Sequence, residues 1–195
     1  PRFGVVEQTV GRTIWQISRT GYTGEDGVEI VVPAVDSMAV WSALCAPEHV
    51  TPAGLAARDS LRFEPGFPLY GHEIDEDRNP VEARLTWACD LDRQFIGRDA
   101  ILAAKRTGVP RKLATFRMRD RGVPRQGCPV LDQSGRHVGT VVTGMYAPTV
   151  DAFAGNAYVD LEYSKIGSTI GVEIRGRAVS AEIVKRPLYR PAYRD

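Results

Sequence analysis

Residue types able to do chemistry are densest in the glycine-rich stretch at residues 19–30, RTGYTGEDGVEI. Glu29 lies inside the apolar run 28–32, where a carboxylate beside apolar neighbours needs a hydrogen-bond donor as its partner. Two interpretations are open: an exposed glutamate on an edge strand, or a carboxylate that accepts N–H groups from a ligand. The glycine-rich turn at 23–27 exposes backbone N–H groups to an anion. The phosphate-loop patterns GxxxxGKS and GxxxxGKT are absent from the sequence.

A second charged segment, 58–64, has the spacing of ion pairs on a helix surface, with Arg58 and Arg62 close to carboxylates. No motif for a serine or cysteine nucleophile is found in the sequence. The histidines and cysteines lack the spacing of metal ligands, so we expect no metal site. The three cysteines are an odd number and widely spaced, so we expect no disulfide framework and a reducing compartment. The histidines are His49, His72 and His137, and the cysteines are Cys45, Cys89 and Cys128.

Composition narrows the class of protein. The 195 residues are 43% hydrophobic and 25% charged, which is enough apolar content to build a core. The formal net charge is only +1, so no basic excess indicates nucleic-acid binding. The longest apolar runs fall far short of the roughly 20 residues of a membrane helix, so we expect no membrane segment. The chain begins with Pro1 and not with Met, which leads us to expect a piece of a longer protein.

Local patterns predict strands followed by helices in the first part of the chain. Residues 5–10 and 13–17 read as the strands of a hairpin, and 28–32 as a further strand. Apolar spacing predicts a helix over 37–45 with Asp36 as its cap, and another over 54–63. Beyond these, we expect an irregular connector at 64–71, a helix start at Asn79-Pro80, and a short helix over 99–105.

From about residue 111 the pattern becomes one of short strands separated by turn residues. Such regular spacing is typical of a small antiparallel barrel or sandwich. The fold class is therefore α+β, with an expected domain boundary near residue 108 that gives domains 1–108 and 109–195. The expected strands are 113–118, 129–131, 138–144, 156–161, 171–175 and 179–184.

Several stretches in the same order resemble the T-protein of the glycine cleavage system, an aminomethyltransferase. They are 19–30, 53–64 (AGLAARDSLRFE), 69–75 (LYGHEID), 79–83 (NPVEA) and 95–98 (FIGR). The resemblance runs from the first residue to the last. It implies part of a folate-binding α/β lobe followed by a C-terminal antiparallel β-barrel.

The resemblance also implies an activity. T-proteins take an aminomethyl group from the lipoyl arm of the H-protein, release ammonia and pass the one-carbon unit to tetrahydrofolate. Tetrahydrofolate is thus the implied acceptor substrate, the lipoylated H-protein the implied partner, and no metal is implied. The implied location is a bacterial cytoplasm or a mitochondrial matrix.

The family's functional residues carry over one at a time. Glu29 stands where the family has a glutamate that holds the pterin, Arg58 where it has a folate-contacting arginine, and Tyr22 where a tyrosine packs against the ligand. Near the C-terminus members use a tyrosine or an arginine; Tyr193 fits the former, Arg190 the latter, and we favour Tyr193. The catalytic aspartate is expected in an N-terminal region that this chain lacks.

Two other classes remain open. The same scaffold occurs in the folate-binding domains of demethylases and of dimethylglycine and sarcosine dehydrogenases. A non-catalytic folate-binding module, in which the barrel docks a partner, is the second. The presence of both Glu29 and Arg58 argues against a degenerate module.

Overall fold

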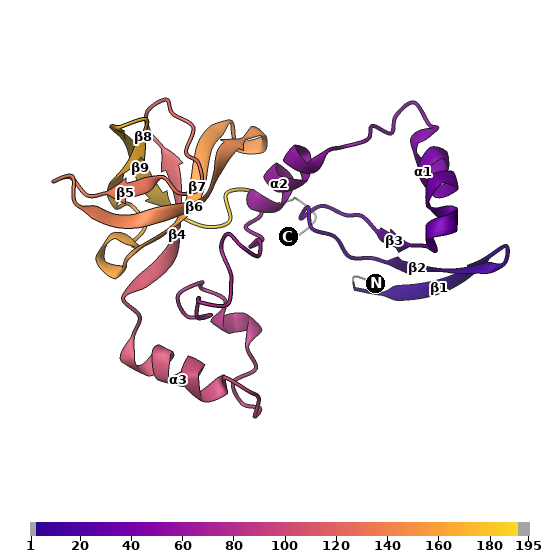
Figure 1. The fold of residues 1–195 in the computed structure, drawn as a ribbon, viewed down its shortest axis with the longest axis horizontal. Coiled ribbons are helices and arrows are strands. Elements are labelled where there is room, and N and C mark those ends of the chain that lie inside the picture. Colours follow the sequence, from indigo (N-terminus) through magenta and orange to yellow (C-terminus); the bar gives the residue numbers. More distant parts are fainter. Residues whose placement is uncertain (1–2, 191–195) are drawn as a thin grey trace. The chain divides into compact units, whose positions relative to one another are not determined.

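The computed structural model describes residues 3–190 of the chain (Figure 1). Its contacts divide the chain into two compact units. The first unit ends at Phe67 and also includes Arg190, and the second runs from Pro68 to Tyr189. The expected domain boundary near residue 108 stays a prediction. Each unit is described separately below.

The first unit is built on a three-stranded antiparallel sheet. Its strands are β1 (Val5–Val10), β2 (Thr13–Ser18) and β3 (Glu29–Val31), in the spatial order β1-β2-β3. Val10 pairs with Thr13, so the turn between β1 and β2 has two residues, and Gly11 adopts a positive φ of 62° there. The predicted hairpin is therefore confirmed, and β3 is an edge strand.

Two helices complete this unit, α1 (Ser37–Cys45), preceded by the short 3-10 helix η1 (Ala34–Asp36), and α2 (Leu55–Phe63). Both helices match their predicted ranges closely. The predicted capping role of Asp36 is wrong, because its side chain makes no cap hydrogen bond. Its carboxylate instead accepts hydrogen bonds from the Thr13 hydroxyl at 2.6 Å and the Trp15 indole at 3.3 Å. Asp36 thereby joins η1 to β2.

Large apolar side chains of the first unit are exposed to an unusual extent. No residue of α1 is buried, and Met38 and Trp41 are 71% and 54% exposed. Every residue of β1 is also exposed. The buried apolar residues of the described chain lie almost entirely in the second unit.

The second unit opens with turns, the 3-10 helix η2 (Thr86–Ala88) and the helix α3 (Arg98–Thr107). The helix predicted over 99–105 is confirmed. The helix start predicted at Asn79 is wrong, since the segment forms consecutive turns. The Asn79 side chain does accept the Val81 N–H at 2.8 Å, as a cap would, but Arg84 takes a left-handed conformation with φ of 57°. A left-handed residue cannot continue an α-helix, so the turn goes no further.

A closed barrel of six antiparallel strands forms the rest of the second unit (Figure 1). The strand order around the barrel is β4-β7-β6-β5-β8-β9, with β9 pairing back to β4. The α+β fold class is confirmed, and the predicted antiparallel barrel or sandwich is a barrel. The strands are β4 (Arg111–Met118), β5 (Pro129–Leu131), β6 (His137–Ala147), β7 (Ala152–Asp160), β8 (Thr169–Ile174) and β9 (Arg177–Val184), with the 3-10 helices η3 (Pro148–Val150) and η4 (Leu161–Tyr163) flanking β7.

The main hydrophobic core lies inside the barrel. Alternate residues of a strand point to the same face, so every second residue of each barrel strand can point inward. The fully buried members of this core come from all six strands. Tyr158, Leu113 and Val142 form a separate small cluster. The most deeply buried core residues include Phe116, Val130, Val141, Val159, Val172 and Ile183. Among the described residues, no helix has the length and apolar character needed to cross a lipid bilayer.

Candidate functional site

The glycine-rich stretch forms the loop between β2 and β3, and an ion pair closes its base. The guanidinium of Arg19 donates to both carboxylate oxygens of Asp26 at 2.9 to 3.2 Å. Gly24, in the middle of the loop, has a positive φ of 77°, and a Cβ at this position would lie 2.7 Å from the side chain of Pro65. Only glycine fits there, because both the backbone conformation and the space exclude a side chain. The loop is thereby seated on the segment that follows α2.

A stack of three side chains lies on this loop. The ring of Tyr22 is stacked on that of Phe67, with ring centroids 5.7 Å apart and planes inclined by 14°. The guanidinium of Arg58, on α2, lies 4.8 Å from the centroid of the Tyr22 ring. The structure therefore brings together two of the predicted site residues, Tyr22 and Arg58. We call Arg58, Tyr22 and Phe67 the cation–aromatic stack.

Arg62 holds the far end of the stack in place. Its side chain is fully buried, donates to Asp59 at 2.7 Å and to the Phe67 carbonyl at 3.1 Å, while the Phe67 N–H donates to the Arg62 carbonyl at 2.9 Å. The sequence pattern predicted a surface ion pair, and for Arg62 that prediction is wrong. The pairing with Asp59 was visible in the spacing, whereas the burial and the bond to Phe67 depend on the chain reversal after α2.

Glu29 is the first residue of β3, at the exposed edge of the sheet. It pairs with Ser18 of β2, and its side chain is exposed. One carboxylate oxygen, Oε2, accepts a hydrogen bond from the hydroxyl of Thr20. The other, Oε1, has no hydrogen-bond partner among residues 3–190. The geometry thus agrees with an exposed edge-strand glutamate and leaves one oxygen for a ligand, so the predicted ligand role of Glu29 stays a prediction.

Of the two candidate residues near the C-terminus, Arg190 and Tyr193, the structure describes only Arg190. Arg190 is exposed and belongs to the first unit. Tyr193 lies outside the described residues. Their expected contacts with a ligand therefore stay predictions.

Within residues 3–190, no three histidine, cysteine or acidic side chains are placed to hold a metal ion together. His72 lies with Nδ1 2.9 Å from the Val142 carbonyl oxygen, next to the barrel wall. The chemistry that the stack and Glu29 offer is binding chemistry. A flat ring can pack on aromatic groups, a carboxylate can accept N–H groups, and a guanidinium can pair with an anion.

Two family models match successive parts of the chain. The N-terminal domain of the glycine cleavage T-protein matches residues 1–93, and the C-terminal barrel domain of the same protein matches residues 111–190. The second match covers the six-stranded barrel of the structure.

Curated relatives and a solved structure agree with these matches. The aminomethyltransferase of Symbiobacterium thermophilum is 49% identical over 91% of this chain and 48% of its own length. That of Herpetosiphon aurantiacus is 45% identical over 98% of this chain and 53% of its own length. The crystal structure of glycine cleavage system aminomethyltransferase T from Bartonella henselae superposes with a TM-score of 0.85 and 34% identity, covering 90% of this chain and 50% of that one.

The matched domains and the superposition define the class of this chain: part of a T-protein N-terminal domain followed by the C-terminal barrel domain of the same protein. The chain belongs to the glycine cleavage T-protein family. It spans about half the length of the curated relatives that it matches.

Proposed function

We propose that this chain contributes the folate-binding half and the C-terminal barrel of a tetrahydrofolate-dependent aminomethyltransferase. The reaction moves the one-carbon unit of an aminomethyl-lipoyl group, carried by the H-protein, to tetrahydrofolate and releases ammonia. The family match supports the reaction class. Folate and the H-protein follow from the family resemblance.

The cation–aromatic stack is the observation that carries the proposal. Cζ of Arg58, on α2, lies 4.8 Å from the ring centroid of Tyr22, in the β2–β3 loop. This loop can adopt its conformation only with glycine at position 24. Tyr22 has a neighbour on each face, so a planar heteroaromatic ring would extend the stack by packing on the exposed guanidinium of Arg58, which attracts π-electrons. The pterin of tetrahydrofolate is a ring of this kind.

Glu29 supplies the hydrogen-bonding part of the proposed site. A pterin presents an amino group and a ring N–H along one edge, and a carboxylate can accept from both. Thr20 occupies Oε2 and thereby fixes the orientation of the carboxylate, while Oε1 faces no described partner. The alternative contact for Arg58 is with the glutamate tail of folate, whose carboxylates suit a planar fork of donors.

In this proposal the chain binds and orients the acceptor, and no residue of it is assigned to proton transfer. The catalytic aspartate of the family is expected outside these 195 residues. The partner is the lipoylated H-protein, and the location is that of the glycine cleavage system, a bacterial cytoplasm or a mitochondrial matrix.

The test compares two glutamates of the same loop region, Glu29→Gln and Glu25→Gln, in the longest natural chain that contains these residues. Glu29→Gln keeps the shape and removes the charge, and a hydrogen bond to a charged group contributes about 1.5–3 kcal/mol. We expect tetrahydrofolate affinity to fall about 10- to 150-fold, measured by isothermal titration calorimetry. Glu25 is exposed in the loop, so Glu25→Gln serves as the matched control.

Unchanged affinity in both variants would show that Glu29 is an ordinary edge-strand residue. Lost affinity in both, with unfolding temperatures unchanged, would locate the effect in the charge of the loop and not in Glu29. A wild-type chain that binds tetrahydrofolate but transfers no aminomethyl group from the H-protein would favour a related demethylase or a non-catalytic module.

A further inference from the structure

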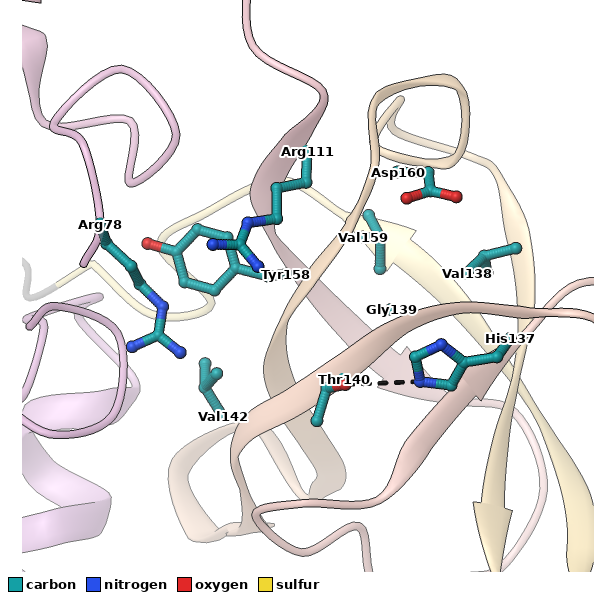
Figure 2. A pocket seen from close by; sticks show the side chains of 10 residues that line it. All are labelled: Arg78, Arg111, His137, Val138, Gly139, Thr140, Val142, Tyr158, Val159 and Asp160. Atoms are coloured by element: carbon teal, nitrogen blue, oxygen red, sulfur yellow. Dashed lines mark hydrogen bonds between the residues drawn. The ribbon is translucent and has the colours of Figure 1, made fainter.

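A cavity that contains no residue of the cation–aromatic stack lies entirely within the second unit. It has a volume of about 350 Å³ and opens where three neighbouring barrel strands meet, at the start of β4, the end of β7 and the start of β6 (Figure 2). Arg111 pairs with Asp160 across β4 and β7, and Thr140 pairs with Tyr158 across β6 and β7. Paired residues present their side chains on one face of a sheet, so these four line the same wall.

Two guanidinium groups lie against one aromatic ring in this cavity. The Cζ atoms of Arg78 and Arg111 are 4.8 and 5.6 Å from the centroid of the Tyr158 ring (Figure 2). Tyr158 is itself fixed, because it is buried and its hydroxyl donates to the Glu73 carbonyl at 2.7 Å. A fixed ring restricts the motion of both guanidinium groups, so the two cations are held in place before any ligand arrives.

Each arginine at the cavity uses one nitrogen in an ion pair and keeps other N–H donors. Arg78 pairs with Asp75 through Nη1, and Arg111 pairs with Glu82 through Nε at 3.1 Å. Burial raises the pKa of the Tyr158 phenol to about 12, so this group stays neutral and does not compensate the arginines. The carboxylate of Asp160, also on the wall, has no ion pair with either arginine among residues 3–190.

Several arginine N–H groups at the cavity have no acceptor in the part of the chain that the structure describes. Nε of Arg78 is buried and has no hydrogen-bond partner among the described residues. The terminal amino groups of Arg111 also have no acceptor in the described chain, but this side chain is 47% exposed, so they are open to solvent and to a ligand. Buried donors without acceptors are costly and rare in folded proteins, and this cost applies to Nε of Arg78. The terminal amino groups of Arg111 are the donors that an anion in the cavity can reach directly. The Thr140 hydroxyl and Nε2 of His137, 3.5 Å apart on β6, add further hydrogen-bonding groups (Figure 2).

We propose that this cavity binds an oxyanion group, a phosphate or a carboxylate, between Arg78 and Arg111. The planar guanidinium forks match the oxygens of either group, and the ring of Tyr158 orients both forks. The ligand is a small anionic molecule that places one such group at the arginines and reaches toward Thr140. This site is independent of the proposed folate site, because every residue that lines it belongs to the second unit.

The experiment titrates the natural chain with inorganic phosphate and, separately, with tricarballylate, and follows the amide and arginine Nε–H signals by NMR. Glutamine replaces Arg78 or Arg111, and Arg119→Gln is the matched control. Arg119 also pairs with a glutamate, Glu182 at 3.0 Å, but it does not line the cavity. Unfolding temperatures are measured for all variants. Thr140→Val is added because it leaves both cation–π contacts in place.

The expected result is saturable shifts of the Arg78 Nε–H signal and of the Gly139 and Thr140 amides. The dissociation constant should rise at least about tenfold in Arg78→Gln and Arg111→Gln, rise less in Thr140→Val, and stay unchanged in Arg119→Gln. Saturable binding of phosphate alone supports the site and identifies the oxyanion group as a phosphate. Saturable binding of tricarballylate alone supports the site and identifies the group as a carboxylate. Shifts that do not saturate, or an equal loss in Arg119→Gln, overturn the proposal in favour of diffuse attraction or of water in the cavity.

Discussion

The guanidinium of Arg58 on α2 lies over the ring of Tyr22 in the β2–β3 loop, 4.8 Å from its centroid. The opposite end of the stack is Phe67, which Arg62 holds by a bond to its carbonyl. Since Gly24 presses against Pro65, the loop and the end of α2 form one structure. The position of Tyr22 is therefore set jointly by a loop and by a helix that lies later in the chain.

The first prediction concerns Arg58→Lys, which keeps the charge and removes the planar group. An exposed cation–π contact is worth about 0.5–1 kcal/mol, so folate affinity should fall about 2- to 5-fold. Titration calorimetry on the longest natural chain provides the measurement. Arg106→Lys, at the exposed end of α3, is the control and should bind as the wild type does. Equal affinity in both variants would mean that the Arg58 contact has no part in binding.

Strands and tight turns were predictable because their signals are local. The hairpin at Gly11 combines alternating residues with glycine at a positive φ and forms where the sequence indicates. The turn at Arg175-Gly176 begins one residue earlier than expected, since Arg175 was expected to end the strand 171–175. The regular spacing of short strands was enough to predict an antiparallel barrel or sandwich. The sequence could not distinguish a barrel from a sandwich, because closure depends on the pairing of β4 with β9 at long range.

The failures share a physical cause, namely partners distant in sequence. Asp36 resembles a helix cap, but the hydroxyl of Thr13 and the indole of Trp15 compete for its carboxylate. Asn79 resembles a helix start, but the left-handed Arg84 ends the turn, and Arg84 is held there by a bond to the Ser164 carbonyl at 3.0 Å. Of the candidate site, residue types were predictable; the stacking of Tyr22 on Phe67 was not.

The second prediction concerns Glu73, a fully buried carboxylate of the second unit. Its oxygens accept from the Leu69 N–H at 3.0 Å and the Asn156 amide at 2.8 Å. Glu73→Ala leaves both donors without these acceptors, which should lower the free energy of unfolding by about 2–5 kcal/mol. Urea unfolding followed by circular dichroism measures the change.

The exposed Glu76 is the control for Glu73, because within residues 3–190 its side chain accepts one weak hydrogen bond, from the Tyr70 hydroxyl at 3.3 Å. Glu76→Ala should change the free energy of unfolding by about 0.5 kcal/mol or less. If both variants unfold at the same urea concentration, the buried bonds of Glu73 do not stabilise the barrel unit.

The third prediction concerns acid stability. The Ser134 hydroxyl, followed by the backbone N–H and the guanidinium of Arg136, holds the pKa of Asp132 well below its ordinary value of 3.8. A carboxyl whose pKa is lower in the folded chain than in the unfolded chain contributes stability above the ordinary value. That contribution is lost as the pH falls below 3.8.

Asp132→Asn should therefore lower the unfolding temperature at pH 7, and the difference from the wild type should shrink as the pH falls below the ordinary aspartate value of 3.8. Scanning calorimetry across this range makes the comparison. Ser134→Ala, which removes the first-named hydrogen bond, should show part of the same pH dependence. A difference that is constant with pH would show that the loop is stabilised by packing alone.

The last prediction concerns the turn between β8 and β9. Ile174 pairs with Arg177, so the turn has two residues, Arg175 with φ of 52° and Gly176 with φ of 76°. Two positive φ values define a type I′ turn, in which asparagine is favoured at the first position and arginine is not. Arg175 is exposed and makes no side-chain hydrogen bond within residues 3–190, so its replacement removes no contact there.

Arg175→Asn should therefore stabilise the chain by about 0.5–1 kcal/mol, because less strain is held in the folded backbone. For a domain of this size the unfolding temperature should rise by roughly 1–4 °C in scanning calorimetry. Arg177→Asn is the matched control: Arg177 is equally exposed, but it lies on the strand, where asparagine is disfavoured, so its unfolding temperature should stay level or fall. A fall in Arg175→Asn as well would show that the arginine is required in the turn and that relief of backbone strain does not govern this hairpin.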